Sequence, residues 1–139
     1  MRIEYSKRAS KTPAFALMAE GWNELVQEGF TPEGDGVSPV KPDNEVLFAV
    51  GDDADVVGVL AYALDAPANA YVVSLAYVEP SSRKRGVFKA LIAQLQKLAR
   101  EDRVDRIELQ AAVENAPFQA VLRHLNRPVV SVVYELATA

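Results

Sequence analysis

The segment from Tyr71 to Glu101 constrains the fold of this chain more than any other, because an apolar stretch passes through a short basic turn directly into an amphipathic pattern. Residues 71–78 are mostly β-branched or aromatic, which predicts a buried strand. From Phe88, apolar residues recur at helical spacing as far as Ala99, which predicts a helix that packs on a sheet through one face. The N–H groups of the first helical turn have no partner within the helix, and the helix dipole favours negative charge there. The segment therefore predicts an anion site where the strand meets the helix.

The turn adds positive charge and conformational freedom to that site. Arg83, Lys84 and Arg85 are consecutive cations, and Gly86 follows them. Glycine lets a ligand approach the backbone closely. We therefore predict that a compact phosphate-bearing ligand binds here. The alternative is an ordinary solvated turn before a surface helix, because short Gly/Arg patterns recur by chance.

Length and composition predict one globular domain, residues 1–139, large enough to bury a core. No apolar run reaches membrane-spanning length, and the first residues lack the apolar region of a signal peptide, so we expect a cytoplasmic protein without a membrane partner. The sequence contains no cysteine and one histidine, His124. This excludes disulfides, thiolate zinc sites, a cysteine nucleophile and a histidine-rich metal site, so no metal is expected.

Charge is segregated along the chain. Residues 83–106 carry eight basic and three acidic side chains, whereas residues 1–82 carry five basic and thirteen acidic ones. A basic island on an acidic protein suits a compact anionic ligand, whereas nucleic-acid binding favours a broad positive face. A nucleic-acid partner is therefore the weaker hypothesis.

The remaining elements follow from periodicity and breakers. Two parallel neighbours are expected across residues 71–112, because a strand, a helix and a strand follow one another there. The predicted fold class is α/β, with a mixed, mostly antiparallel sheet flanked by helices. The predicted elements are an edge strand at 1–6, a helix at 13–28 with Thr12 as N-cap and Pro13 as first residue, a long loop at 30–44, a meander of strands at 46–50, 56–64 and 70–78, a strand at 103–113, a short helix after Asn115, and a strand at 129–136.

Four residues of the central segment resemble the pyrophosphate-binding motif of the GNAT superfamily of N-acetyltransferases. That motif is Val-x-Pro-x-x-(Arg/Gln)-x-x-Gly-x-(Gly/Ala), and Val78, Pro80, Arg83 and Gly86 match it in place. Phe88 departs from it, because the family usually has a small residue there. A bulky side chain that points into the core would leave the N–H group accessible.

A second stretch resembles the same family, and the order of elements is similar over nearly the whole chain. Leu109, Ala111 and Asn115 occupy the positions of the family pattern Leu-x-Val-x-x-x-Asn, with alanine in place of valine; in that pattern the asparagine contacts the cofactor near its pantetheine arm. The resemblance implies acetyl-CoA as co-substrate. The cofactor-binding residues that it implies are Ala76, Tyr77, Val78, Arg83, Lys84, Arg85, Gly86, Val87, Phe88, Asn115 and Phe118.

The catalytic residues are less clearly marked. Seven residues after the asparagine, where the family often has a tyrosine that protonates the departing thiolate, this chain has Leu122. Tyr134 or Tyr77 could supply that proton, although a strand tyrosine is more often a packing residue. Glu79 and Gln110, with Glu108, are candidates for orienting the amine or a water that removes its proton. His124 could act as a base by its intrinsic pKa, but a lone histidine is more often structural.

The sequence leaves two functions open. The resemblance implies an acetyl-CoA-dependent N-acetyltransferase acting on an unidentified amine of a small molecule or a protein. Leu122 and Phe88 motivate the alternative, a GNAT-fold protein that binds an acyl-CoA or a protein partner without catalysis. Residues 129–134 could also extend a sheet across a homodimer.

Overall fold

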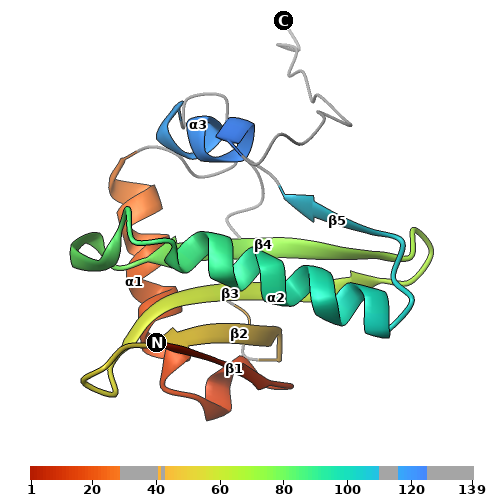
Figure 1. The fold of residues 1–139 in the computed structure, drawn as a ribbon, viewed down its shortest axis with the longest axis horizontal. Helices are drawn as coiled ribbons and strands as arrows, with labels where there is room; N and C mark the ends of the chain where they lie inside the picture. Colours follow the sequence, from red (N-terminus) through yellow and green to blue (C-terminus); the bar gives the residue numbers. More distant parts are fainter. Residues whose placement is uncertain (29–40, 42, 110–115, 125–139) are drawn as a thin grey trace, which may run out of the picture.

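The computed structural model describes residues 1–28, 41, 43–109 and 116–124. They form one sheet with a long helix on each face, and a third, short helix (Figure 1). The long helix α2 follows the central strand β4 through the short 3-10 turn η2, as the periodicity predicts. In chain order the elements are β1 (Arg2–Ser6), the 3-10 turn η1 (Ala9–Lys11), α1 (Ala14–Gln27), β2 (Glu45–Val50), β3 (Val56–Asp65), β4 (Ala70–Val78), η2 (Pro80–Ser82), α2 (Val87–Glu101), β5 (Arg106–Leu109) and α3 (Ala116–His124).

The described strands form one mixed sheet in the order β1-β2-β3-β4-β5. The pairs β1–β2, β2–β3 and β3–β4 are antiparallel, and β4–β5 is parallel. The predicted edge strand, the meander and the parallel pair are therefore confirmed, and so is the α/β class. The predicted strand at 129–136 and the N-cap Asn115 lie outside the described residues.

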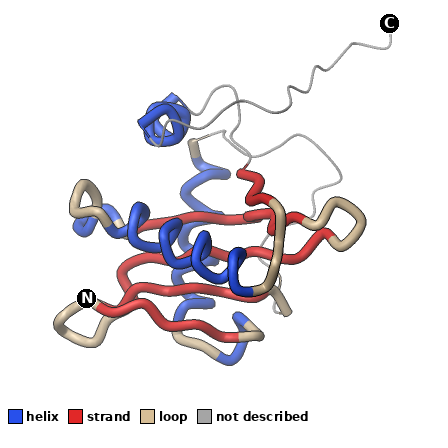
Figure 2. The backbone as a smooth tube through the Cα atoms, turned by 45° about the vertical axis from the view of Figure 1, so that its right-hand side comes forward, coloured by secondary structure: helices blue, strands red, loops and turns tan. Residues whose placement is uncertain are grey.

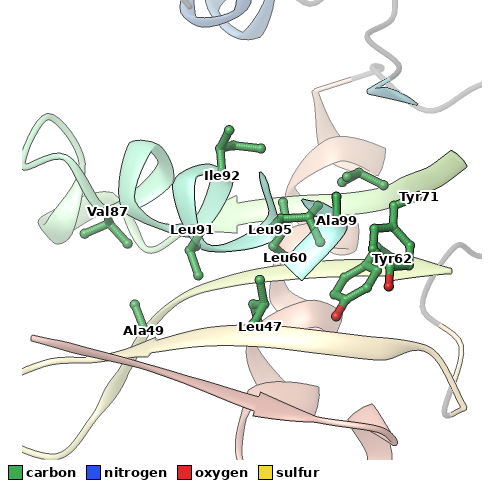
Figure 3. Packing of buried hydrophobic residues seen from close by; sticks show 11 residues of the cluster. Leu47, Ala49, Leu60, Tyr62, Tyr71, Val87, Leu91, Ile92, Leu95 and Ala99 are labelled. Carbon is green, nitrogen blue, oxygen red and sulfur yellow. The ribbon is translucent and has the colours of Figure 1, made fainter. Parts of the chain in front are cut away.

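The sheet separates two apolar clusters, because side chains of each strand alternate between its faces. Figure 2 shows α2 in front of the sheet and α1 behind it. Leu47, Leu60 and Tyr62 pack against α2, and Figure 3 shows them with Leu91 and Leu95 of that helix. The opposite cluster packs against α1 and includes Val46, Phe48, Val59, Ala61 and Leu75. Both faces of the central strands are thus covered, which explains their nearly continuous apolar sequence.

Two glycines bring the helices unusually close to the sheet. A Cβ atom on Gly58 of β3 would lie 2.6 Å from Cγ1 of Val87, the first residue of α2. A Cβ atom on Gly21 of α1 would lie 2.7 Å from Cγ of Tyr77 near the end of β4. These two contacts hold α2 and α1 against the sheet at the same end of β4, where the candidate anion site lies.

The predicted start of α1 is wrong by one residue. Thr12 Oγ1 donates to the carbonyl oxygen of Ala9 at 2.8 Å, so it closes the preceding 3-10 turn and does not cap α1. Pro13 occupies the N-cap position, and no side chain of the described residues caps the helix.

The predicted start of the strand at 103 is also wrong, because the end of α2 extends into that segment. Arg103 has a φ of 57°, and its N–H donates to the Arg100 carbonyl at 3.3 Å. The Val104 N–H donates to the Ala99 carbonyl at 2.8 Å. These two bonds form a Schellman motif, with arginine at the left-handed position that usually holds glycine. As a result β5 begins at Arg106.

Candidate functional site

Residues 83–86, which join η2 to α2 and are called the bend below, are exposed and have an unusual backbone. The side chains of Arg83, Lys84 and Arg85 are exposed, as is Gly86. Lys84 has a φ of 63° and Gly86 a φ of 80°, both in the left-handed region. A Cβ atom on Gly86 would meet no atom of the described residues within 4 Å, so the backbone conformation, and not packing against them, requires this glycine.

The start of α2 presents N–H groups that have no partner among the described residues. The N–H groups of Ser82 and Arg83 donate within η2, and that of Ala90 donates to the Gly86 carbonyl at 3.0 Å. Between them, the N–H groups of residues 84–89 donate to no acceptor in the part of the chain that the structure describes. No described side chain caps α2, and its first turn contains no acidic residue. This is the arrangement that binds an anion at a helix N-terminus.

The three cations of the bend have different surroundings. Within the described residues, Lys84 and Arg85 form no ion pair. Arg83 is engaged: its Nη2 lies 3.0 Å from both carboxylate oxygens of Glu24 on α1, and its Nε donates to the Val78 carbonyl at 2.9 Å. Its guanidinium carbon also lies 5.4 Å from the centre of the Tyr77 ring. Lys84 and Arg85 are therefore better placed than Arg83 to meet a ligand.

Glu24 belongs to this site although no sequence pattern marks it. Besides Arg83, it accepts a 2.5 Å hydrogen bond from the Tyr77 hydroxyl. Burial, this hydrogen bond and the charge of Glu24 raise the pKa of Tyr77 to about 12. Burial acts to raise the pKa of Glu24, but the hydrogen bonds from Tyr77 and Arg83 and the charge of Arg83 outweigh it, so the net change is a lowering. The hydroxyl proton of Tyr77 is thus committed to Glu24, which disfavours Tyr77 as the acid for a thiolate.

The end of β4 has one strand partner in the described part of the chain. β3 pairs with β4 as far as Val78, but β5 pairs with it only from Ala70 to Val73. Figure 1 shows β5 angled away from β4. The β5 side of residues 74–78, which include the predicted cofactor-binding residues Ala76, Tyr77 and Val78, therefore has no partner strand among the described residues.

The first two side chains of α2, Val87 and Phe88, pack on the protein interior. Val87 is buried against Gly58, so only its main chain can contact a ligand. Phe88 is half-buried, packs on the cluster beneath α2, and makes an edge-to-face contact with Phe118 of α3, with ring centroids 5.9 Å apart. The bulky ring thus packs on the core, as expected from its place on the apolar face of the predicted helix.

The model of the acetyltransferase (GNAT) family matches residues 14–126. The chain belongs to the GNAT family. The match includes both the bend and α3. No curated protein matches the chain by sequence.

Solved structures share the GNAT fold of this chain. A tetramutant of the BH1408 protein from Bacillus halodurans superposes with a TM-score of 0.73 at 15% identity, covering 99% of both chains. Aminoglycoside N-acetyltransferase AAC(6')-Iy, solved in complex with CoA, gives 0.66 at 17% identity and also covers 99% of both chains. Nourseothricin acetyltransferase gives 0.56 at 28% identity over 60% of this chain and 49% of its own.

The structure does not describe all of the residues predicted for the site of this GNAT protein. Gln110, Asn115 and Tyr134 lie outside the described residues. Leu122 lies on α3 and supplies no acid. Among the described residues, no group of three or more His, Asp or Glu side chains is arranged to hold a metal, and no helix is long and apolar enough to cross a membrane.

The candidate Glu79 directly follows β4 and is the N-cap residue of η2. Its Oε1 accepts hydrogen bonds from Ser81 Oγ at 3.1 Å and Ser82 Oγ at 2.8 Å, which stabilises η2. The residue also borders a cavity of about 360 Å³ between α1 and the β2–β3 turn. The other residues lining this cavity are Pro13, Ala16, Leu17, Glu20, Ala54, Asp55 and Val56.

Proposed function

We propose that this protein is an acetyl-CoA-dependent N-acetyltransferase that transfers an acetyl group to an amine of a small molecule or a protein. The observation that supports it best is the exposed bend of a GNAT family member, where N–H groups of residues 84–89 find no acceptor among the described residues and two cations stand beside them. A pyrophosphate is the kind of compact anion that such a bend binds. AAC(6')-Iy, which shares the fold, was solved with CoA.

Acetyl-CoA would supply the acetyl group as a thioester. The N–H groups of residues 84–89 would bind its pyrophosphate, and Lys84 and Arg85 would add charge beside them. On the β5 side of β4, the main-chain N–H group of Ala76 or Val78 would donate to the carbonyl oxygen, which becomes negative when the amine attacks, since the N–H groups of a strand alternate between its two sides and that of Tyr77 faces β3. Positioning of this kind supplies a large part of the rate without a dedicated acid.

Proton transfer in this proposal relies on residues other than Leu122 and Tyr77. Glu79 borders a cavity, and its Oε2 accepts no hydrogen bond from the described residues, so it can orient an amine or a water. Tyr134 and Gln110 stay predictions for the acid and for amine orientation. Glu79→Gln should lower kcat for an amine acceptor and leave the Kd for CoA unchanged. Equal loss of CoA binding would contradict this role.

The first test is calorimetric titration of the folded protein with CoA. Binding should weaken at least about tenfold in the double variant K84A/R85A, the equivalent of ~1.4 kcal/mol. The matched control K97A/R100A removes the same charge from exposed positions of α2 farther from the bend and should stay within about twofold, because salt screens distant charges. Absence of CoA binding to the folded wild type would overturn the proposal.

The second candidate function is CoA binding without catalysis, which the missing acid at Leu122 favours. Acetyl transfer to a panel of amines, followed by release of free thiol, separates the two. Aminoglycosides and nourseothricin lead the panel, because acetyltransferases named for them are among the similar structures. Turnover that disappears in K84A/R85A would exclude the non-catalytic function.

A further inference from the structure

Glu24 joins three elements at one point. Its carboxylate accepts two 3.0 Å contacts from Nη2 of Arg83 in the bend, and a 2.5 Å hydrogen bond from Tyr77 near the end of β4. Glu24 itself belongs to α1, which packs on the sheet face opposite α2. The carboxylate therefore links the far side of the sheet to the residue where the bend begins.

The linkage is tightly held on both sides. On the α1 side, Gly21 lies against the Tyr77 ring so closely that a Cβ atom would be 2.7 Å from it. On the bend side, Arg83 is restrained by Glu24, by the Val78 carbonyl and by the Tyr77 ring. Arg83 immediately precedes Lys84, where the backbone takes its positive φ. The position of Arg83 thus sets the direction in which the chain enters the bend.

We propose that Glu24 is a positioning residue for the coenzyme A site: through Arg83 and Tyr77 it fixes the start of the bend, so that the N–H groups of residues 84–89 stay available to the pyrophosphate. The inference rests on the proposed function. It assigns Arg83 to holding the bend and leaves the direct charge contacts with phosphate to Lys84 and Arg85.

The test compares two carboxylates of α1. Glu24→Gln keeps the size of the side chain and removes its charge. Glu20→Gln makes the same change one turn earlier, at an exposed residue that forms no hydrogen bond or ion pair among the described residues. Well below the Tm of each variant, the Kd for CoA should rise at least about fivefold in E24Q, as expected for loss of a charged hydrogen-bond acceptor, and stay within about twofold in E20Q. A lowered Tm with an unchanged Kd would show a purely structural role and overturn the proposal.

Arg83→Met separates positioning from direct phosphate contact. In the proposal, R83M weakens CoA binding as much as E24Q does, and the double variant E24Q/R83M shows no further loss, because both changes break one linkage. R83M should also keep the salt dependence of CoA binding, whereas K84A/R85A should flatten it. If Arg83 contacts phosphate directly, R83M flattens the salt dependence and E24Q leaves the Kd unchanged or lowers it. That result would overturn the assignment.

Backbone-amide NMR of the ligand-free protein gives a readout independent of CoA. The resonances of residues 84–89 should shift and their hydrogen exchange should change in E24Q and R83M, but not in E20Q. Unchanged amides in both variants would overturn the proposal even if CoA binds. If the wild type does not bind CoA while these amides respond to E24Q, the proposed function fails and the linkage from Glu24 to the bend stands without a coenzyme role.

Discussion

Replacing Gly58 of β3 by alanine should move the first turn of α2 and damage the candidate site. The new Cβ atom would lie 2.6 Å from Val87 Cγ1 and 3.3 Å from Leu91 Cδ1. Optimal carbon contacts lie at about 3.5–4.0 Å, so the Val87 side must retreat by about 1 Å. Because α2 begins at Val87, the displacement falls on the N–H groups that the proposal assigns to the pyrophosphate.

The size of the effect follows from the burial of this contact. Val87 and Leu91 are 5% and 0% exposed, so the strain cannot be relieved into solvent. Overpacking of this kind destabilises a core by about 1–3 kcal/mol. Unfolding entropy is ~2.1 cal/mol/K per residue, or about 0.3 kcal/mol/K for a chain of 139 residues, so the Tm should fall by about 3–10 °C. CoA affinity should fall as well.

Thermal unfolding followed by circular dichroism and titration with CoA measure the two effects. Gly51→Ala is the matched control, because its Cβ atom would lie 3.3 Å from Val57 Cγ1 and needs a shift of only a few tenths of an ångström. Val87→Ala removes the clashing methyl group, so G58A/V87A should be more stable than the sum of the single changes predicts. A Tm for G58A within about 1 °C of the wild type would refute the packing argument, since ~1 kcal/mol is its lower bound.

Three further predictions concern single groups. Gly86→Ala should destabilise the protein by about 1–2 kcal/mol in thermal unfolding, because it forces an alanine into the left-handed region and adds no contact with the described residues. No loss of stability would show that the bend relaxes freely. Tyr71→Phe removes the 2.5 Å hydrogen bond to Asp102 at the end of α2 and should cost about 1 kcal/mol, and adding D102N should cost little more if this bond is what is lost. The lowered pKa of Glu24 contributes stability that is present above the unfolded-state pKa and lost as the pH falls through the folded-state pKa. In urea unfolding, the wild type should therefore lose more stability on acidification than E24Q does. Equal losses would contradict the lowered pKa of Glu24.

Local patterns predicted the elements that hold the site. The strand–turn–helix from Tyr71 was predictable because a buried strand and an amphipathic helix have distinct periods. The left-handed conformation of Gly86 is seen only in the structure. The same patterns predicted that the start of the helix stays exposed and that Phe88 lies on the apolar face of the helix. Element ends were less predictable: Arg103 takes a left-handed conformation that its residue type does not signal, and β5 therefore starts later than its apolar pattern suggests.

Contacts between distant residues could not be predicted in the same way. Glu24 and Arg83 are 59 residues apart, and nothing near Glu24 distinguishes it from the exposed Glu20 on the same helix. Their pairing depends on how close α1 lies to β4, and Gly21 permits that approach because it places no side chain against Tyr77. A glycine inside a helix and a carboxylate one turn later become informative only when the strand opposite them is known.

The proposed coenzyme site is built mainly from main chain, and this explains why its side chains can depart from the family pattern. An N–H group binds an anion whatever side chain its residue carries, provided that the backbone has the correct φ and the side chain points elsewhere. Phe88 meets the second condition by packing on the core and Phe118. Lys84 meets the first with a φ of 63°, at the expense of left-handed strain in a residue with a Cβ atom. The features that must persist are those that hold the backbone, namely the close approach at Gly58, the left-handed Gly86 and the restraint of Arg83 by Glu24. Substitutions there should therefore reduce CoA binding more than substitutions at Phe88 that keep an apolar side chain.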